Sequence, residues 1–217
     1  MNKTLLYNFI AIEGNIGAGK TSLAKQIAAT FNAQLILEQF EENSFLPKFY
    51  ENPSKYALPL ELSFLVERHQ QLKTETSNGK IKSLIVSDYF FLKSMIFASE
   101  NLNEDERLIY TKLFNILHDT LPKPELFVYL HQNTDNLIKN IKKRGRPYEQ
   151  NIQAAYLQQI EKSYFNFLKQ QSNLKILILD ISTANFVDNV ENYDLLIQTI
   201  NQPYSLGITN KTINLKR

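Results

Sequence analysis

The hydrophobic positions fall into short apolar runs that alternate with longer segments of helical periodicity. The runs are almost continuously apolar, which is typical of strands in a parallel sheet that is covered on both faces. They cover residues 8–12, 34–37, 83–86, 126–130 and 175–179. The helical segments cover residues 20–30, 59–74, 89–100, 104–119, 135–144, 152–170 and 186–202. This alternation predicts a doubly wound α/β fold, with a five-stranded parallel sheet and helices on both of its faces.

We expect one domain over residues 1–202 and a C-terminal tail over residues 203–217. The tail is polar and weakly patterned, so it is either a short strand or disordered. Right-handed crossovers place the loop after each strand at the carboxyl edge of the sheet, where α/β proteins bind their ligands. The functional residues are therefore sought directly after the predicted strands.

The composition is that of a soluble globular protein, with 43% hydrophobic and 21% charged residues among 217. The chain has no cysteine, which excludes disulfides and thiolate chemistry and is compatible with a reducing cytoplasm. A net charge of +2 gives no general attraction to nucleic acid or to a membrane surface. Every apolar run is far shorter than the ~20 residues of a membrane span. We therefore expect a cytoplasmic protein that binds neither nucleic acid nor membranes.

A glycine-rich loop follows the first predicted strand and opens the first predicted helix. It fits the pattern G-x-x-x-x-G-K-[ST] and, with the next residue, comprises Gly14, Asn15, Ile16, Gly17, Ala18, Gly19, Lys20, Thr21 and Ser22. Such a loop surrounds phosphates with backbone N–H groups at a helix N-terminus. Lys20 would reach the β- and γ-phosphates of ATP, and the Thr21 hydroxyl would bind Mg²⁺. The alternative is a glycine turn that only ends the strand.

The loop predicts nucleotide binding but not what is done with the nucleotide, because GTPases, motors and small-molecule kinases share it. A GTPase needs an N-K-x-D loop after a strand, and residues 210–213 read N-K-T-I, without the aspartate. The chain is also short for a mechanical ATPase. A kinase that phosphorylates a small hydroxyl substrate fits the length best.

Residues 139–146 carry five basic side chains and no acid. The lysines among them, Lys139, Lys142 and Lys143, are predicted to form the solvated face of a helix, with a nucleic-acid patch as the alternative. Arg144 and Arg146 differ, because a glycine separates them and the chain has only five arginines. Phosphoryl transfer needs rigid, planar donors that close over the transferring group. We interpret the two arginines as part of an arginine-rich lid.

These motifs together resemble those of the deoxyribonucleoside kinases, in particular the bacterial deoxyadenosine/deoxyguanosine type, which phosphorylate the 5′-hydroxyl of a deoxynucleoside with ATP and Mg²⁺. The similar segments span about residues 7–180 and comprise 13–22, Glu38, Tyr50, 52–53, 56–59, 87–88, 144–150, Ile152 and 176–180. The glycine loop alone is generic, whereas its order with Glu38, Tyr50 and the R-G-R-x-x-E-Q segment is specific. The resemblance implies a P-loop kinase fold, a role in nucleoside salvage, and a homodimer packed through helices.

Two acidic residues end predicted strands at the carboxyl edge of the sheet. Glu38 can accept the proton of an attacking hydroxyl, and Asp88 can hold or orient the metal together with Thr21. An acid that merely flanks a strand is the alternative for Glu38, and the resemblance decides for the general base. The catalytic residues are then Glu38, Lys20, Arg144 and Arg146.

The resemblance also implies how the nucleoside is bound. Tyr50 and Glu149 match positions that hydrogen-bond the sugar 3′-hydroxyl. Glu61 and Arg68 are seven residues apart, so they share one helix face, and the resemblance places both beside the base. Phe97 is expected to stack on the base. Packing in the core is the alternative for the two aromatic residues.

The chain departs from the family pattern at two positions. Tyr89 stands where the family has an arginine near the 5′-oxygen, a loss that Lys93 or the lid could compensate. Glu61 stands where most members read the base with glutamine. An ionised carboxylate only accepts hydrogen bonds, so Glu61 could accept from an adenine or cytosine amino group or from two guanine donors, whereas thymine offers one donor and an opposed carbonyl. With Arg68 as the expected partner that keeps Glu61 ionised, we expect a purine, deoxyadenosine before deoxyguanosine.

Two other functions fit the same loop and fold. A nucleoside monophosphate kinase would need further cations for the phosphate of its acceptor, and arginine is scarce outside the lid. A nucleotide-binding regulator that has lost catalysis is suggested only by Tyr89. The expected ligands are therefore ATP with Mg²⁺ and a deoxynucleoside.

Overall fold

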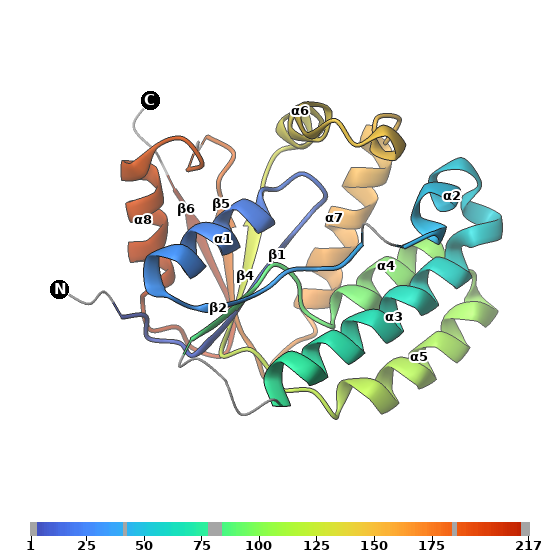
Figure 1. Ribbon diagram of the computed structural model, residues 1–217, viewed down its shortest axis with the longest axis horizontal. Coiled ribbons are helices and arrows are strands. Elements are labelled where there is room, and N and C mark those ends of the chain that lie inside the picture. Colours follow the sequence, from blue (N-terminus) through green and yellow to red (C-terminus); the bar gives the residue numbers. More distant parts are fainter. Residues whose placement is uncertain (1–3, 41–42, 78–83, 184–185, 214–217) are drawn as a thin grey trace.

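A six-stranded, entirely parallel sheet forms the centre of the protein (Figure 1). The computed structural model describes residues 4–40, 43–77, 84–183 and 186–213. The strands in these ranges are β1 (Phe9–Gly14), β2 (Gln34–Ile36), β3 (Ile85–Ser87), β4 (Leu126–His131), β5 (Lys175–Asp180) and β6 (Gly207–Thr212). Their order is β2-β3-β1-β4-β5-β6, so β1 is central and lies between β3 and β4.

Successive residues of the central strands point to opposite faces of the sheet. Phe9 and Ala11 of β1 belong to one hydrophobic core, whereas Ile10 and Ile12 belong to the other. The same alternation continues in β4, where Phe127 joins the core of Phe9. Because both faces are covered, almost every position of these strands is apolar, and this produces the continuous runs seen in the sequence.

Helices cover both faces of the sheet (Figure 1). In chain order they are α1 (Lys20–Phe31), α2 (Phe45–Glu51), α3 (Pro53–Ser77), α4 (Lys93–Asn101), α5 (Glu104–His118), α6 (Thr134–Arg144), the 3₁₀ turn η1 (Pro147–Glu149), α7 (Ala154–Leu168) and α8 (Val190–Ile200). Helices α1 and α8 contribute to the core of Ile10, and α3, α4 and α7 contribute to the core of Phe9. The predicted doubly wound fold is therefore confirmed. In the described residues, no helix has both the length and the apolar character that crossing a bilayer requires.

The C-terminal tail contributes the sixth strand, one more than the five predicted. Strand β6 pairs with β5 along its whole length, from Gly207 beside Lys175 to Thr212 beside Asp180. Its sequence is polar, and its side chains are half-buried or exposed, because β6 lies at the edge of the sheet. An edge strand of this kind lacks the apolar run that identifies the central strands. Residues 214–217 of the tail lie outside the described residues.

Several helical segments differ from the predicted bounds, among them α8, which begins at Val190 and not at residue 186. The hydrophobic pattern does not predict α2, and α3 begins at Pro53 rather than at Pro59. Proline is well tolerated in the first turn of a helix, where the backbone N–H groups have no helical partner, so Pro53 can begin α3. Pro59, the predicted first residue, lies inside the helix. Residues 89–92, predicted as the start of a helix, form a buried connection before α4. Residue 83, predicted in a strand, lies outside the described residues.

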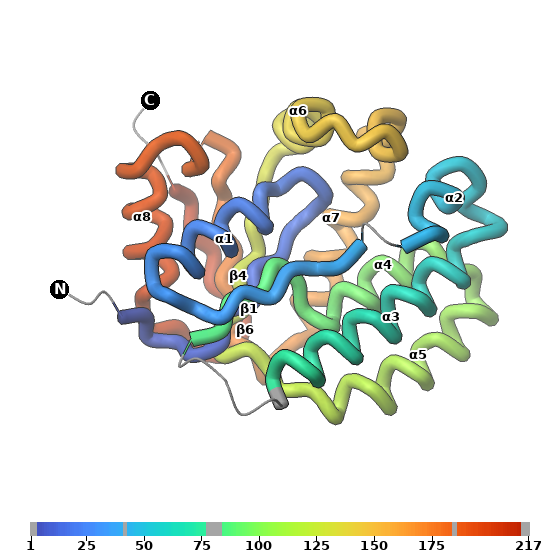
Figure 2. Tube along the Cα trace, viewed as in Figure 1, coloured from blue at the N-terminus to red at the C-terminus, as the bar shows by residue number. Residues whose placement is uncertain are grey.

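The carboxyl ends of the parallel strands meet at one edge of the sheet, and α6 and η1 lie beside this edge. Figure 2 shows them in yellow at the top, between the α1 side and the α2 side of the protein. The side-chain amide of Asn140 in α6 donates to the Gly17 carbonyl oxygen at 2.9 Å. The segment predicted as a lid thus lies against the glycine loop on one side and against α2 on the other.

Candidate active site

The glycine loop after β1 has a backbone shape that excludes side chains at two positions. Gly14 has φ +150°, and a Cβ atom there would lie 2.7 Å from the Leu130 carbonyl oxygen of β4. Gly17 has φ +82°, and a Cβ atom there would lie 2.8 Å from the Leu137 carbonyl oxygen of α6. Only glycine fits such close backbone approaches. Helix α1 begins directly after the loop, so the loop ends at a helix N-terminus, as anion binding requires.

Lys20, the first residue of α1, turns back across the loop. Its ammonium group donates to the carbonyl oxygens of Gly14 and Asn15 at 3.0 and 2.9 Å. Burial lowers the pKa of Lys20 to about 8, and the positive charge of Lys93 adds to this effect. The side chain is therefore mainly protonated at neutral pH, and its charge lies where the loop would hold phosphates.

Thr21 and Asp88 bring a hydroxyl and a carboxylate together. The Thr21 hydroxyl donates to Asp88 Oδ2 at 2.5 Å, and the Glu38 backbone N–H donates to Asp88 Oδ1 at 2.8 Å. Such oxygens suit Mg²⁺, which takes one or two carboxylates and completes its shell with water and substrate phosphates. Within the described residues, no cluster of three or more His, Cys, Asp or Glu side chains could hold a metal ion by itself. Thr21 and Asp88 thus fit a magnesium ion that enters with a nucleotide.

Glu38, which follows β2, is held between two cations from different helices. Its Oε1 accepts from Arg68 of α3, at 2.7 Å from Nη2 and 2.9 Å from Nε. Its Oε2 lies 2.5 Å from the ammonium group of Lys93 in α4. Burial favours the neutral carboxyl group, but the charges of Lys93 and Arg68 outweigh burial and lower the pKa of Glu38 to about 2. The carboxylate is therefore ionised throughout the physiological pH range.

Tyr89 stands where the family pattern has an arginine, and its side chain is completely buried. Its hydroxyl donates to Gln71 Oε1 in α3 at 2.6 Å, and Gln71 Nε2 donates to the Leu37 carbonyl oxygen at 2.9 Å. Tyr89 thus braces the backbone directly before Glu38 and supplies no charge. A cation on Glu38 comes instead from Lys93, one of the two substitutes expected from the sequence.

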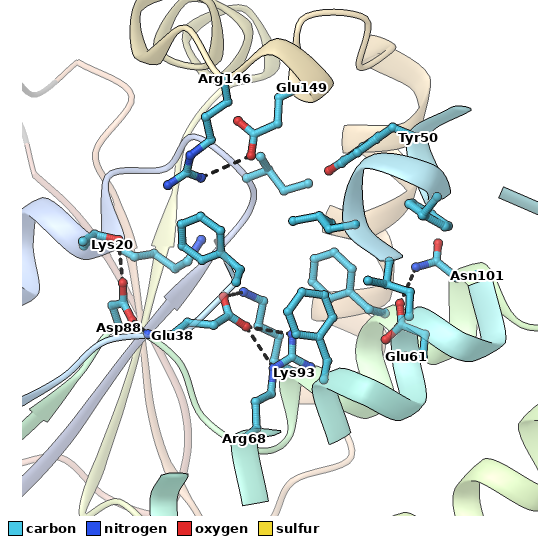
Figure 3. Close-up of a pocket in the computed structure, with 18 of the residues that line it drawn as sticks. Lys20, Glu38, Tyr50, Glu61, Arg68, Asp88, Lys93, Asn101, Arg146 and Glu149 are labelled. Carbon is cyan, nitrogen blue, oxygen red and sulfur yellow. Dashed lines mark hydrogen bonds and ion pairs between the residues drawn. The ribbon is translucent and has the colours of Figure 1, made fainter. Parts of the chain in front are cut away.

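A cavity of about 760 Å³, counting the part open to solvent, lies between the sheet edge, α2, α3, α4 and the lid (Figure 3). It is hereafter the acceptor cavity. Its lining includes all the side chains predicted for catalysis, nucleoside binding and metal binding, namely Lys20, Thr21, Glu38, Tyr50, Glu61, Arg68, Asp88, Phe97, Arg144, Arg146 and Glu149. Figure 3 shows Lys20 and Asp88 at one end, Glu61 at the other end, and Glu38 between them.

The acceptor cavity also has lining residues that the sequence did not single out. They are Phe40, Leu46, Phe49, Leu60, Phe64, Asn101 and Tyr156. The apolar members of this set have the same helical or strand spacing as core residues, so no sequence signal separates them from the core. Asn101 ends α4 and resembles an ordinary capping residue in the sequence. Its role in the cavity becomes visible only through its contact with Glu61.

Glu61 is buried in α3, and its partner is not the predicted one. Its Oε1 accepts from the side-chain amide of Asn101 at 2.7 Å. Arg68 is engaged by Glu38 and, at 2.9 Å, by the Ser94 hydroxyl. The prediction that Arg68 pairs with Glu61 and keeps it ionised is therefore wrong. Two helical turns, about 10 Å, separate the two residues along α3, whereas Glu38 lies next to Arg68. Burial raises the pKa of Glu61 to about 7.

One acidic residue of the lid holds both lid arginines. Glu149 in η1 accepts from Arg144 through Oε2 and from Arg146 through Oε1, the latter at 3.2 Å. The Arg146 guanidinium also lies 4.0 Å from the ring centre of Phe40, in the segment after β2. Gly145, with φ +76°, ends α6 between the two arginines. These contacts hold both guanidinium groups at the mouth of the site, although Arg144 is still exposed to solvent.

A second cavity, hereafter the donor cavity, adjoins the glycine loop and α6. It is lined by residues 17–22, by Asn136, Asn140 and Lys143 of α6, by Arg144 and Arg146, and by residues 186–188. Lys20, Thr21 and the two lid arginines line both cavities. The cavities therefore meet at the lysine of the phosphate loop and at the lid. The lysines of α6 are exposed, as predicted for a solvated face.

Comparison with known proteins identifies the family. The sequence model of the family described as "Deoxynucleoside kinase" matches residues 10–204. The chain belongs to the deoxynucleoside kinase family. It is 37% identical over 192 residues to a deoxyguanosine kinase of Bacillus subtilis, covering 86% of this chain and 92% of that one. It is 32% identical over 189 residues to a deoxyadenosine kinase of Dictyostelium discoideum, covering 86% of this chain and 76% of that one.

Solved structures agree with the family. A structure of deoxyadenosine kinase from M. mycoides with bound dCTP has a TM-score of 0.73 at 26% identity, over 88% of this chain and 98% of that one. A structure of the same kinase with dCMP and dCDP bound gives 0.74 at 25% identity, with the same coverage. The chain is thus a deoxynucleoside kinase, and the main prediction holds over the nucleoside monophosphate kinase and the inactive regulator.

Proposed function

We propose that this deoxynucleoside kinase transfers the γ-phosphoryl group of ATP to the 5′-hydroxyl of a purine deoxynucleoside, for nucleoside salvage in the cytoplasm. The observation that carries the proposal is that the acceptor and donor cavities meet at Lys20 and the lid arginines, with ionised Glu38 in the acceptor cavity. A hydroxyl in one cavity and a triphosphate in the other would face each other across the charges that phosphoryl transfer needs.

On the donor side, the glycine loop and Lys20 would bind the phosphates of ATP. The Thr21 hydroxyl and the Asp88 carboxylate would hold Mg²⁺, which neutralises phosphate charge when it is bound. Arg144 and Arg146 would close over the transferring group with planar, rigid donors. Their bonds to one carboxylate in the lid support this role, because the guanidinium groups are already positioned.

Glu38 would accept a hydrogen bond from the 5′-hydroxyl and take its proton as the new O–P bond forms. A pKa of about 2 makes Glu38 a weak base, so early removal of the proton is not its contribution. The transition state of phosphoryl transfer is loose, and the hydroxyl becomes acidic only late in the step. A permanently ionised and firmly held carboxylate therefore acts mainly by positioning the nucleophile.

The sugar and the base would occupy the rest of the acceptor cavity. Tyr50 and Glu149 would hold the 3′-hydroxyl. The Tyr50 ring stacks on Tyr148 of the lid with 6.0 Å between ring centres, and Glu149 bonds both lid arginines. Sugar binding would thus be coupled to the phosphate clamp. Phe97 and Arg68 would contact the base, and Glu61 would read it.

We infer a purine from two observations together, the names of the relatives and a Glu61 carboxyl oxygen, Oε2, that is buried without a hydrogen-bond partner in the described residues. The amino group of adenine or cytosine, or the ring N–H and amino group of guanine, would satisfy it. The names deoxyguanosine kinase and deoxyadenosine kinase of the two relatives favour a purine over cytosine, whereas the solved deoxyadenosine kinase from M. mycoides also holds dCTP. The proposed substrates are deoxyadenosine and deoxyguanosine.

The function is tested by following ADP release with ATP, Mg²⁺ and each deoxynucleoside in turn, with dAMP and dGMP as further acceptors. We expect turnover with the two purine deoxynucleosides and none with the monophosphates. Lys20→Ala should abolish turnover without changing the melting temperature greatly, because its charge is needed on the transferring phosphate. Activity of Lys20→Ala within about tenfold of the wild type would contradict the assignment of the phosphate site.

Replacing Glu38 with Gln keeps its shape and removes its charge. Nucleoside binding should persist, while kcat should fall by about 10²–10⁴, the range for a side chain that positions the nucleophile and receives its proton. The melting temperature should also fall, because Arg68 and Lys93 lose their buried counter-charge. Steady-state kinetics with a thermal melt measures this. The matched control is Glu51→Gln, the same chemical change at an exposed end of α2. An unchanged kcat with a raised KM would show that Glu38 only binds the nucleoside.

The double variant Arg144→Lys with Arg146→Lys keeps both charges but removes the planar forks. It should lose much of kcat, because an arginine clamp is worth about 10³–10⁵ in rate. The control is Lys139→Ala with Lys142→Ala, which removes two charges from the exposed face of α6 and should leave kcat nearly unchanged. A fully active double lysine variant would mean that the arginines are not a clamp.

We also infer that the kinase is a homodimer. Helix α5 carries apolar residues on its outer face, where Ile109, Leu113 and Ile116 are 63%, 41% and 69% exposed. Their i, i+4, i+7 spacing forms one stripe. Figure 2 shows α5 beside α3, along the outer edge of the protein. A stripe of this kind suits burial against the same stripe of a second copy.

Sedimentation equilibrium should therefore give twice the chain mass of 25.2 kDa. Ile109→Glu with Ile116→Glu should give the monomer, because two charges would oppose burial of the stripe. Lys25→Glu, on exposed surface of α1, is the control and should stay dimeric. A monomeric wild type at micromolar concentration would overturn the inference.

A further inference from the structure

The acceptor cavity contains a carboxyl group with one bonded and one unbonded oxygen. Glu61 is 1% exposed, and its Oε1 accepts from Asn101 Nδ2 at 2.7 Å. Asn101 Oδ1 accepts in turn from the Tyr156 hydroxyl of α7 at 3.2 Å, so the amide is fixed from both sides. Glu61 Oε2 is buried and has no partner in the described residues. An unsatisfied buried oxygen in a ligand cavity is a place for a ligand group.

Among the residues that the structure describes, no cation pairs directly with Glu61. Five titratable groups interact electrostatically with the Glu61 carboxyl group. They are Glu38 after β2, Arg68 in α3, Lys93 in α4, Tyr110 in α5 and Tyr156 in α7. The two cations among them, Arg68 and Lys93, bind Glu38. The Tyr110 hydroxyl donates at 3.3 Å to the Glu61 backbone carbonyl oxygen and not to its carboxyl group. Burial therefore dominates and raises the pKa of Glu61 to about 7. Both protonation states are populated near neutral pH.

The Asn101 amide decides where a proton on Glu61 would lie. An N–H group cannot donate to an oxygen whose O–H points back at it, so the proton belongs on Oε2, the unbonded oxygen. Protonated Glu61 then offers a donor at Oε2 beside an acceptor at Oε1. Ionised Glu61 offers two acceptors.

The two purines match these two states differently. Adenine presents an amino donor next to a ring nitrogen acceptor, which complements a protonated carboxyl group. Guanine presents a ring N–H next to an amino group, two neighbouring donors that complement a carboxylate. Adenine beside a carboxylate would place its ring nitrogen, an acceptor, against an acceptor oxygen. Guanine beside a protonated carboxyl group would place one of its donors against the O–H donor. Both contacts leave buried polar groups without a hydrogen bond, which is unfavourable.

We propose that Glu61, oriented by Asn101, selects between the two purine deoxynucleosides through its own protonation, binding deoxyadenosine when protonated and deoxyguanosine when ionised. The proposal rests on the proposed function, since it assumes that the base lies at this end of the acceptor cavity. It makes Asn101 a positioning residue for the choice of base. It also makes the substrate preference of the kinase depend on pH.

The test measures kcat/KM for deoxyguanosine and for deoxyadenosine between pH 6 and pH 8. Their ratio cancels titrations that affect both substrates, including those of ATP and of Glu38. The ratio should rise with pH, by up to about 100-fold over this range, because it follows the ratio of ionised to protonated Glu61. A ratio that does not change with pH overturns the proposal. Phosphorylation of both purines with a flat ratio leaves the kinase function intact, whereas failure with every deoxynucleoside overturns that function itself.

Two variants separate this effect from general damage. Glu61→Gln cannot ionise and keeps a donor beside an acceptor, so its ratio should be independent of pH and should favour deoxyadenosine. Asn101→Ala removes a donor that stabilises the ionised form, so the rise of the ratio should move to higher pH. A ratio in Glu61→Gln that still rises with pH would place the titrating group elsewhere.

A measurement on the unmodified enzyme does not depend on how the variants fold. Calorimetric binding at pH 7 in buffers of different ionisation enthalpy counts the protons exchanged. Deoxyadenosine should take up part of a proton on binding, and deoxyguanosine should release part of one. The same proton count for both purines would contradict the proposal.

Discussion

The geometry of the site depends on a buried triad of charges, the Glu38 carboxylate between Arg68 and Lys93. Both cations are almost completely buried, and either would be strongly unfavourable there without a counter-charge. The three groups come from the end of β2, from α3 and from α4. The triad therefore holds two helices against the sheet edge and keeps one carboxylate ionised in the acceptor cavity.

Hydrogen bonds with neighbouring side chains also fix the backbone at Leu37 and Glu38. Asp88 accepts from the Glu38 N–H, while Gln71, held by Tyr89, donates to the Leu37 carbonyl. The peptide before Glu38 is thus fixed on both sides, and its side chain is fixed by the two cations. Lys93 of α4 places a positive charge beside Glu38, so this arrangement does not need an arginine directly after Asp88 for that charge. Tyr89 supplies rigidity in its place.

The features that could be predicted from the sequence are those with a local signal. Glycines mark where backbone excludes side chains, as at Gly14, and parallel strands share one polarity, which places Glu38 and Asp88 at the same edge. Partners from different elements have no such signal. Helical spacing placed Glu61 and Arg68 on one face of α3 but could not show that Glu38 lies closer to Arg68, or that Asn101 reaches Glu61. The edge strand β6 could not be predicted as a strand of the sheet with certainty, because its exposed positions need not be apolar and so give no hydrophobic pattern.

The central claim is that Glu38 receives the 5′-hydroxyl while Glu61 receives the base. A crystal structure with a purine deoxynucleoside and a non-hydrolysable ATP analogue tests this most directly. We expect the 5′-oxygen within hydrogen-bond distance of a Glu38 carboxylate oxygen, about 2.6–3.2 Å. It should be in line with the γ-phosphate beside Lys20 and the lid, with the base against Glu61. A nucleoside bound the other way round, with its base at Glu38 and its 5′-oxygen at Glu61, would contradict the claim.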